Sequence, residues 1–237
     1  MTEIKVMVVD DSPFMRRVIS DIINGQADMK VVATARNGEE ALLAAKRFAP
    51  DVITMDVEMP VMDGLEALQR IMKDNPLPVV MLSSVTKQGA DATVKALHLG
   101  AVDFITKPSG TLSPDINEVA RDIVKKIRIA ALARDKLRLT QVRVDKRIKP
   151  PKVSPAGIDK APEKVILIGT STGGPKALHE VIPKLPGNIP AAVLVVQHMP
   201  PGFTRSLAER INGMSALNVK EAVDGEPVLS GDRKSVG

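Results

Sequence analysis

The stretch KVMVVDDS, residues 5–12, decides the fold of the first half of the chain. Four apolar residues in a row end in two aspartates, and comparable apolar runs recur at residues 30–33, 52–55, 79–82 and 103–106. Runs of this length are typical of parallel strands that helices cover on both faces. Stretches with a helical pattern lie between them, such as GEEALLAAKRFA, residues 38–49, which Asn37 is placed to cap. The alternation predicts an α/β fold with a doubly wound, five-stranded parallel sheet.

The composition of the 237 residues restricts the classes of protein to consider. No apolar run is long enough to span a membrane, and acids stand near the N-terminus, where a signal peptide has its apolar core. The chain has no cysteine, which excludes disulfides, thiolate metal sites and a cysteine nucleophile. Only three histidines are present for imidazole chemistry. We therefore expect a soluble, cytoplasmic protein.

Positive charge is concentrated in the middle of the chain. Residues 121–164 contain fourteen lysines and arginines and five acids, a net charge of +9 in a chain whose total is +5. Such a segment is usually a solvated linker, and the alternative is a strip that docks nucleic acid or a protein partner. With no tryptophan, no tyrosine and four phenylalanines, the chain has few of the aromatic residues on which single strands stack. The composition favours a linker.

The pattern divides the chain into two domains. A further helix begins at residues 113–115, SPD, and is expected to run toward Leu139. Residues 142–162 contain four prolines and no periodicity, which is typical of a linker. After it the alternation restarts, with three strands expected at residues 164–169, 191–197 and 218–223 and helices at 176–184 and 202–211. We expect a first domain at residues 1–125, a helical extension and basic, proline-rich linker at 126–162, and the start of a second doubly wound parallel α/β domain at 163–237.

Polar residues follow four of the predicted strands of the first domain. They are Asp10 and Asp11, Asp56, Ser83 and Ser84, and Lys107. Because the carboxyl ends of parallel strands meet at one edge of a sheet, we expect these side chains to lie together. Three crowded carboxylates repel one another, and a hard divalent cation such as Mg²⁺ relieves that repulsion. A carboxylate acceptor, a hydroxyl and an ammonium suit phosphoryl transfer. The alternative, in which the acids only cap helices, explains Asp11 or Asp56 singly but not the matching lysine and hydroxyl.

Four stretches of the first domain resemble the receiver domain of two-component response regulators. They are VMVVDDS at residues 6–12, ITMDVEMPVMDG at 53–64, VVMLSS at 79–84 and DFITKP at 103–108. The resemblance covers about residues 1–125 and implies a flavodoxin-like fold for the five-stranded sheet. It further implies that Asp56 is the phosphoacceptor. It also implies that Asp11, Asp56 and the backbone carbonyl of Glu58 hold Mg²⁺, with Asp10 acting through water.

The same resemblance assigns roles to three further residues. Ser83 is expected to meet the phosphoryl group, and Lys107 to pair with it. Phe104 stands where the family keeps an aromatic residue that repacks on phosphorylation.

A second motif, VILIGTSTGGPKAL at residues 165–178, opens the second domain. The dinucleotide fingerprint G-x-G-x-x-G needs a glycine two positions after Gly169, where Ser171 stands. The phosphate-binding P-loop needs a lysine directly after its second glycine, but Pro175 follows Gly174 and supplies no amide donor. The pattern G-x-S-x-G is satisfied between a strand and a helix, as in a nucleophile elbow. A generic anion site at the helix N-terminus stays open as an alternative.

A serine nucleophile needs a base, and the three histidines differ in their position. His98 falls in a helical stretch of the first domain, and His179 is about 12 Å from Ser171 along the following helix. His198 ends the predicted strand at residues 191–197, at the same sheet edge as Ser171, and is the candidate base. The acid that would orient it is not identified. Glu180 lies on a helix, and no convincing strand precedes the later acids, Glu209, Glu221, Asp224, Glu226 and Asp232.

The stretches IGTSTGGPKAL, residues 168–178, and VVQHMPPGFTRSLAERI, residues 195–211, resemble the CheB family when taken with the receiver in front of them. This family comprises the chemotaxis response regulator protein-glutamate methylesterases. The resemblance implies that Ser171 is the nucleophile, that Thr172 lies beside it and that His198 is the base. It places the catalytic Asp beyond residue 237, and residues 233–237, RKSVG, depart from the family pattern. We therefore expect a C-terminally truncated catalytic domain with weak or no activity.

The resemblance also implies a function and partners. The substrates are glutamate methyl esters on methyl-accepting chemotaxis receptors, hydrolysed with release of methanol, and certain receptor glutamines, which are deamidated. A chemotaxis histidine kinase is the phosphodonor, and phosphorylation of Asp56 relieves the receiver's cover of the Ser171 edge during adaptation in bacterial or archaeal chemotaxis. We expect no nucleic-acid partner and contact with the membrane only through receptors.

Two rival functions stay open. A receiver that drives a nucleic-acid-binding output through the basic segment predicts a helix-turn-helix in the second half. A phosphorylation-competent binding module without esterase activity predicts the same motifs with an incomplete catalytic site.

Overall fold

We describe the chain from a computed structural model, in which it divides into two compact units, Met1–Val144 and Asp145–Gly237. The structure describes residues 3–84, 86–107, 116–134, 162, 164–227 and 232–236, without the side chains of Ile116 and of 232–236. The predicted extension of a helix to Leu139 and nearly all of the predicted linker lie outside these residues. The domain boundaries at 125 and 162 stay predictions, and the helix α5, Ile116–Leu132, continues past the first of them.

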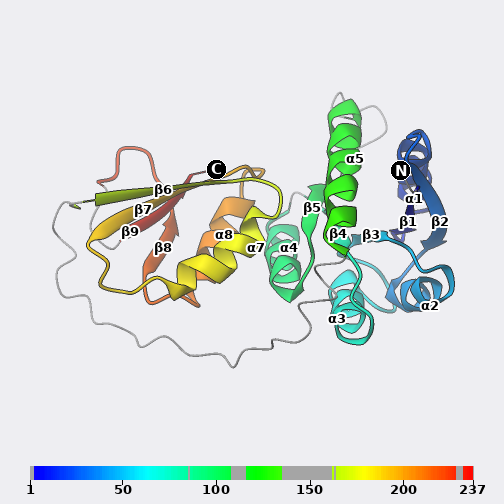
Figure 1. The fold of residues 1–237 in the computed structure, drawn as a ribbon, viewed down its shortest axis with the longest axis horizontal. Helices are drawn as coiled ribbons and strands as arrows, with labels where there is room; N and C mark the ends of the chain where they lie inside the picture. Colours follow the sequence, from blue (N-terminus) through cyan, green and yellow to red (C-terminus); the bar gives the residue numbers. More distant parts are fainter. Residues whose placement is uncertain are drawn as a thin grey trace. The chain divides into compact units, whose positions relative to one another are not determined.

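The first unit is a five-stranded parallel sheet in the order β2-β1-β3-β4-β5, which confirms the predicted fold class. Helices α1 and α5 cover one face and α2, α3 and α4 the other (Figure 1). The strands are β1 Ile4–Val9, β2 Met29–Ala35, β3 Val52–Asp56, β4 Val79–Ser83 and β5 Asp103–Thr106. The other helices are α1 Pro13–Asn24, α2 Gly38–Phe48, α3 Gly64–Asp74 and α4 Lys87–Leu99.

The apolar runs of the first unit form its core because helices cover both faces of the sheet. Val6 to Val9 of β1 are completely buried, and Val80 and Leu82 of β4 pack with Ile123 of α5 in one cluster. The helices begin where the sequence offers a cap: the Asn37 side chain accepts from Glu40 N at 2.9 Å, as predicted. These caps fix the strand-to-helix turns that carry the polar residues at the carboxyl edge.

The second unit has a four-stranded parallel sheet in the order β6-β7-β9-β8. Its elements are β6 Lys164–Thr170, α7 Gly174–Val181, the short 3-10 helix η1 Ile182–Lys184, β7 Ala191–Gln197, α8 Phe203–Asn212, β8 Asn218–Glu221 and β9 Asp232–Val236. The expectation of three strands was wrong, because residues 232–236 insert as a fourth strand between β7 and β8. The predicted strand and helix positions before it are confirmed, and the second unit begins a parallel α/β sheet, as expected.

Among the described residues, helices cover one face of the second sheet. In β7, Val193, Val195 and Gln197 are buried, whereas Val196 is 57% exposed. The alternation shows which side of the sheet meets α7 and α8, since neighbouring residues of a strand point to opposite faces. No described helix in either unit is long and apolar enough to cross a membrane.

Candidate functional site

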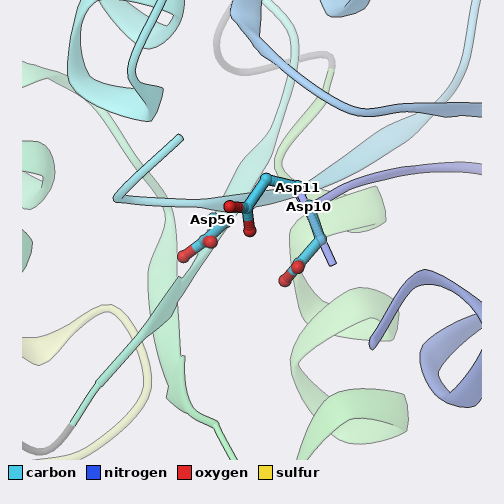
Figure 2. A group of neighbouring side chains, drawn as sticks. All are labelled: Asp10, Asp11 and Asp56. Carbon is cyan, nitrogen blue, oxygen red and sulfur yellow. The ribbon is translucent and has the colours of Figure 1, made fainter. Parts of the chain in front are cut away.

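Three carboxylates meet at the carboxyl edge of the first sheet. Asp10 and Asp11 follow β1 and Asp56 ends β3, and one oxygen of each lies within 4.8 Å of the others (Figure 2). Asp10 and Asp56 are buried, whereas Asp11 is exposed. This confirms that the residues that the sequence placed at one edge lie together in space.

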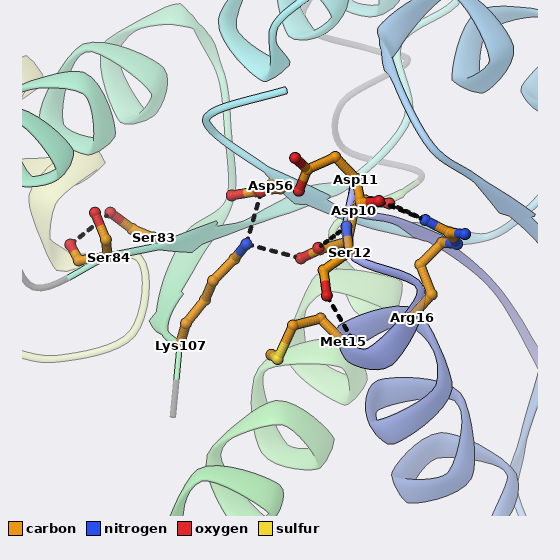
Figure 3. A network of polar contacts seen from close by, with 9 residues as sticks. All are labelled: Asp10, Asp11, Ser12, Met15, Arg16, Asp56, Ser83, Ser84 and Lys107. Atoms are coloured by element: carbon orange, nitrogen blue, oxygen red, sulfur yellow. Dashed lines mark hydrogen bonds and ion pairs between the residues drawn. The ribbon is translucent and has the colours of Figure 1, made fainter. Parts of the chain in front are cut away.

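Lys107 is the cation of this cluster. Its Nζ lies 2.9 Å from Asp10 Oδ2 and 2.6 Å from Asp56 Oδ2 (Figure 3). Its backbone N–H donates to Ser83 O at 2.8 Å, which fixes the chain where it leaves β5. One ammonium therefore offsets two buried carboxylates, and the third carboxylate has solvent access.

The electrostatics of the cluster are dominated by burial. Desolvation raises the pKa of Asp56 from 3.8 to about 6, against hydrogen bonding and charge from Lys107, which lower it. Asp10 raises the same pKa further, and the backbone N–H of Glu58 donates to the carboxylate and lowers it. For Lys107, burial lowers the pKa, but hydrogen bonds to Asp56 and Asp10 outweigh it, so the pKa is raised overall. The site concentrates negative charge that a cation can stabilise.

The donor set fits a hard divalent cation. Three carboxylate oxygens within reach of one another, one of them from an exposed side chain, match the oxygen ligands and retained waters that Mg²⁺ prefers. The backbone N–H of Glu58 contacts the Asp56 carboxylate, and the expected role of its carbonyl as a ligand stays a prediction. Within the described residues, no histidine joins these three candidate metal ligands.

Ser83 and Phe104 have their polar contacts away from the carboxylates. Ser83 Oγ accepts from Thr93 Oγ1 at 2.7 Å and lies 3.1 Å from Gly89 O, so α4 engages it. Phe104 is 3% exposed, and Lys126 Nζ lies 5.2 Å from its ring centroid. Their expected roles toward a phosphoryl group stay predictions.

Arg16 is a residue of this site that the sequence analysis missed. Its Nη1 donates to Asp10 O at 2.7 Å and to Asp11 O at 3.0 Å (Figure 3). Ser12 caps α1, and Arg16 lies one helical turn further on, so its guanidinium reaches back over the acidic turn. A basic residue at that spacing behind an acidic strand end was the available signal.

A second group of polar residues lies at the carboxyl edge of the second sheet. Thr170 of β6 pairs with Gln197 of β7, and His198 N donates to Thr170 O at 3.1 Å. Ser171 and His198 therefore leave neighbouring parallel strands side by side, and both are exposed. Within the described residues, no hydrogen bond joins the Ser171 hydroxyl to the His198 imidazole.

The turn that carries Ser171 differs from a nucleophile elbow in one respect. In that motif the serine itself sits at the strained position of the turn. Here Gly173, at φ 74°, takes the left-handed conformation, and Ser171 is not among the described residues with positive φ. Gly174 N then donates to Ser171 O at 2.7 Å, which closes the turn at the start of α7.

The other histidines and acids are placed elsewhere. His98 is exposed in the last turn of α4, and His179 Nδ1 lies 2.8 Å from Pro175 O within α7. Three of the candidate acids are engaged in other contacts: Glu209 with Arg205, Glu221 with Thr204 and Glu226 with Lys220. Asp224 is exposed, and the side chain of Asp232 lies outside the described part of the chain.

Comparisons with known proteins match parts of both units. Residues 6–113 match the model of the response regulator receiver domain, and residues 166–233 match the model of the CheB methylesterase. The chain is similar to the crystal structure of the response regulator domain of Thermotoga maritima CheB, with 54% sequence identity and a TM-score of 0.51. The match covers 55% of this chain and 97% of that structure.

Two curated relatives extend the similarity through both units. A protein-glutamate methylesterase/protein-glutamine glutaminase of Syntrophomonas wolfei is 52% identical over 225 residues, or 95% of this chain. One from Halalkalibacterium halodurans is 51% identical over 230 residues, or 97% of this chain. The matched regions span 64% and 65% of those proteins, so the chain spans just under two thirds of their length. The chain belongs to the CheB family, with a response regulator receiver domain followed by a region similar to CheB methylesterase.

Proposed function

We propose that this chain is a phosphorylation-regulated protein-glutamate methylesterase and protein-glutamine deamidase of chemotaxis. The observation that carries the proposal is the parallel register of β6 and β7, which brings Ser171 and His198 to neighbouring strand ends. The names of the relatives supply the substrate class, glutamate methyl esters and glutamines of proteins. The substrates are then methyl-accepting chemotaxis receptors, which the chain reaches from the cytoplasm, so that contact with the membrane is only through receptors.

The proposed reaction uses the two side chains in fixed roles. The His198 imidazole accepts the proton of the Ser171 hydroxyl while Ser171 Oγ attacks the side-chain acyl carbon of the methylated glutamate. Methanol leaves with that proton and an acyl-serine remains. Water, deprotonated by the same imidazole, then releases the glutamate carboxylate and restores the serine. For glutamine the leaving group is ammonia.

The backbone after Ser171 is the proposed source of oxyanion stabilisation. Gly174 N donates to Ser171 O, so it is used within the turn. The amide of Thr172, which adjoins the nucleophile, is the nearer candidate for the oxygen of the tetrahedral intermediate. We assign Thr172 to the site for this reason.

The receiver supplies the proposed regulation. Asp56 accepts a phosphoryl group from a chemotaxis histidine kinase, Lys107 pairs with that group, and Ser83 donates to it after leaving its contacts with α4. Asp10, Asp11, Asp56 and the carbonyl of Glu58 hold Mg²⁺, which supplies positive charge against the carboxylates and phosphoryl oxygens when bound. Phe104 is proposed to repack in response.

We expect low esterase activity from this chain. Three of its five candidate acids are engaged elsewhere, and a serine and histidine without their acid keep only part of the catalytic power of a triad. A nucleic-acid-binding output is less well supported, because the described elements of the second unit alternate strands and helices and include no helix-turn-helix.

Methanol release from methylated receptor membranes tests the proposal. We expect release by the full chain to rise with acetyl phosphate and Mg²⁺, to vanish in Ser171→Ala, and to lose its response to acetyl phosphate in Asp56→Asn. Release that persists in Ser171→Ala contradicts the assigned nucleophile. Phosphoryl uptake that persists in Asp56→Asn contradicts the assigned acceptor.

A further inference from the structure

Gln197 is a buried polar residue that the proposed reaction does not use. It is the last residue of β7 and 1% exposed, on the covered face of the second sheet next to Val195. A buried amide is unfavourable unless its hydrogen-bonding groups are satisfied, so its contacts show what holds it there.

The side-chain amide of Gln197 joins the two strand ends of the candidate site. Its Nε2 donates to Ser171 O at 3.2 Å and to His198 O at 3.1 Å. One NH₂ group therefore uses both of its hydrogens, one on the backbone of each candidate residue. The side chains of Ser171 and His198 are exposed, so backbone contacts of this kind control how far apart they stand.

Thr170 supplies the hydrogen-bond partner of the amide oxygen. Thr170 Oγ1 donates to Gln197 Oε1 at 2.6 Å, which leaves Nε2 toward the two carbonyls. A flipped amide would direct Oε1 at two carbonyl oxygens, and oxygen cannot donate to either. The two carbonyls therefore set the orientation, and the hydroxyl of Thr170 satisfies the amide oxygen.

The first turn of α7 is shaped to admit this arrangement. A Cβ atom on Gly174 would lie 2.1 Å from Gln197 Oε1 and 2.7 Å from Thr170 Cβ. Only glycine allows the turn to approach the two side chains so closely. Gly169 shows the contrast, because a Cβ there meets nothing within 4 Å.

We propose that Gln197 is a positioning residue that holds the Ser171 turn and the His198 strand end at a fixed separation, with Thr170 holding the oxygen of its amide. This inference rests on the proposed roles of Ser171 and His198 for its consequence in catalysis. The clamp, by which we mean the hydrogen bonds that join the Gln197 amide to Thr170, Ser171 and His198, does not depend on those roles.

Hydrogen exchange in the full chain tests the clamp. Gln197→Met keeps the length of the side chain and removes its donors, so we expect the amides of Gly174 and His198 to exchange about tenfold faster, as for the loss of two hydrogen bonds. Thr170→Val, which keeps shape and loses the hydroxyl, should accelerate the same amides less, and Thr170→Ser should match the parent. The double variant Gln197→Met with Thr170→Val should show the same exchange rates as Gln197→Met alone, since the two residues act as one unit.

The outcomes separate the clamp from general packing. Val195→Ala is the matched control: it removes buried apolar volume from the same strand and should leave the Gly174 amide at its parental rate. Parental exchange at Gly174 in Gln197→Met overturns the proposal. If Gln197→Met unfolds the second unit, equal exchange in Thr170→Val and Thr170→Ser overturns it instead.

A fluorophosphonate probe tests the consequence for Ser171. With the clamp lost, we expect the maximal rate of covalent labelling at Ser171 to fall while the concentration of probe for half-maximal rate is unchanged, and Val195→Ala to alter neither. Unchanged maximal labelling in Gln197→Met overturns the positioning role. A parent chain that is never labelled at Ser171 contradicts the proposed function, and the exchange experiment still decides the clamp.

Discussion

The substitution Asp56→Asn should change how the stability of the receiver depends on pH. Burial raises the pKa of Asp56 from 3.8 to about 6, so the native state binds this proton more tightly than the unfolded chain does. The stabilisation that this gives is complete below pH about 4 and is lost as the pH rises through about 6. Two pKa units correspond to about 3 kcal/mol.

Asparagine carries no titrating proton, so the variant lacks this dependence. We expect the free energy of unfolding of Asp56→Asn, minus that of the parent, to increase by about 2.5 kcal/mol between pH 4 and pH 8. The difference between two pH values removes the pH-independent effect of exchanging a carboxyl for an amide. Lys107 keeps its ion pair with Asp10 in both proteins, at 2.9 Å in the parent structure.

The assay must follow the receiver alone, without Mg²⁺. The chain has neither tryptophan nor tyrosine and contains two units, so we would monitor urea unfolding by hydrogen exchange of peptides from β1 and β3. Asp28→Asn is the control of sign: a hydrogen bond from Arg128 lowers the pKa of Asp28 below 3.8, so this variant should lose stability relative to the parent as the pH rises toward about 4 and change little above it. If the difference in the free energy of unfolding between Asp56→Asn and the parent is constant, or decreases toward pH 8, the reasoning is refuted.

Three further predictions concern the metal and two turns. Millimolar Mg²⁺ should raise the urea midpoint of the receiver peptides and should do so less in Asp11→Asn; equal rises in both contradict the three-carboxylate site. Val61→Gly should stabilise the receiver by about 1 kcal/mol in the same assay. Val61 is 77% exposed and is held at φ 70° in a γ-turn, in which Met62 N donates to Pro60 O, so valine is strained there. A loss of stability contradicts the strain. Gly174→Ala should destabilise the second unit by about 1–3 kcal/mol, measured on peptides of β7, whereas Gly169→Ala introduces no clash; equal effects contradict the close approach at Gly174.

The receiver site was predictable because its topology is simple. Each polar residue follows an apolar run, and parallel strands bring their carboxyl ends to one edge, so Asp10, Asp56 and Lys107 had to converge. Arg16 was missed because a basic residue on a helix surface is ordinarily solvated, and its contacts are with backbone oxygens that no sequence pattern displays.

The second unit was less predictable for two physical reasons. Residues 232–236, DRKSV, are too polar to indicate an interior strand, and pairing with β7 and β8 overrides that local preference. In the sequence, Gln197 is only the last residue of an apolar strand, and nothing there indicates its contacts. Its clamp depends on the register that sets it beside Thr170 and on the closeness of Gly174, both of which arise only on folding.

The pairing of Ser171 with His198 is the central claim, and a cysteine substitution tests it most directly. The chain has no cysteine, so Ser171→Cys carries a single thiol whose alkylation by iodoacetamide can be followed against pH without any substrate. We predict a thiol pKa at least about one unit below the usual value of about 8.5, and a return to about 8.5 when His198→Ala is added. The same alkylation profile with and without His198 would contradict the account.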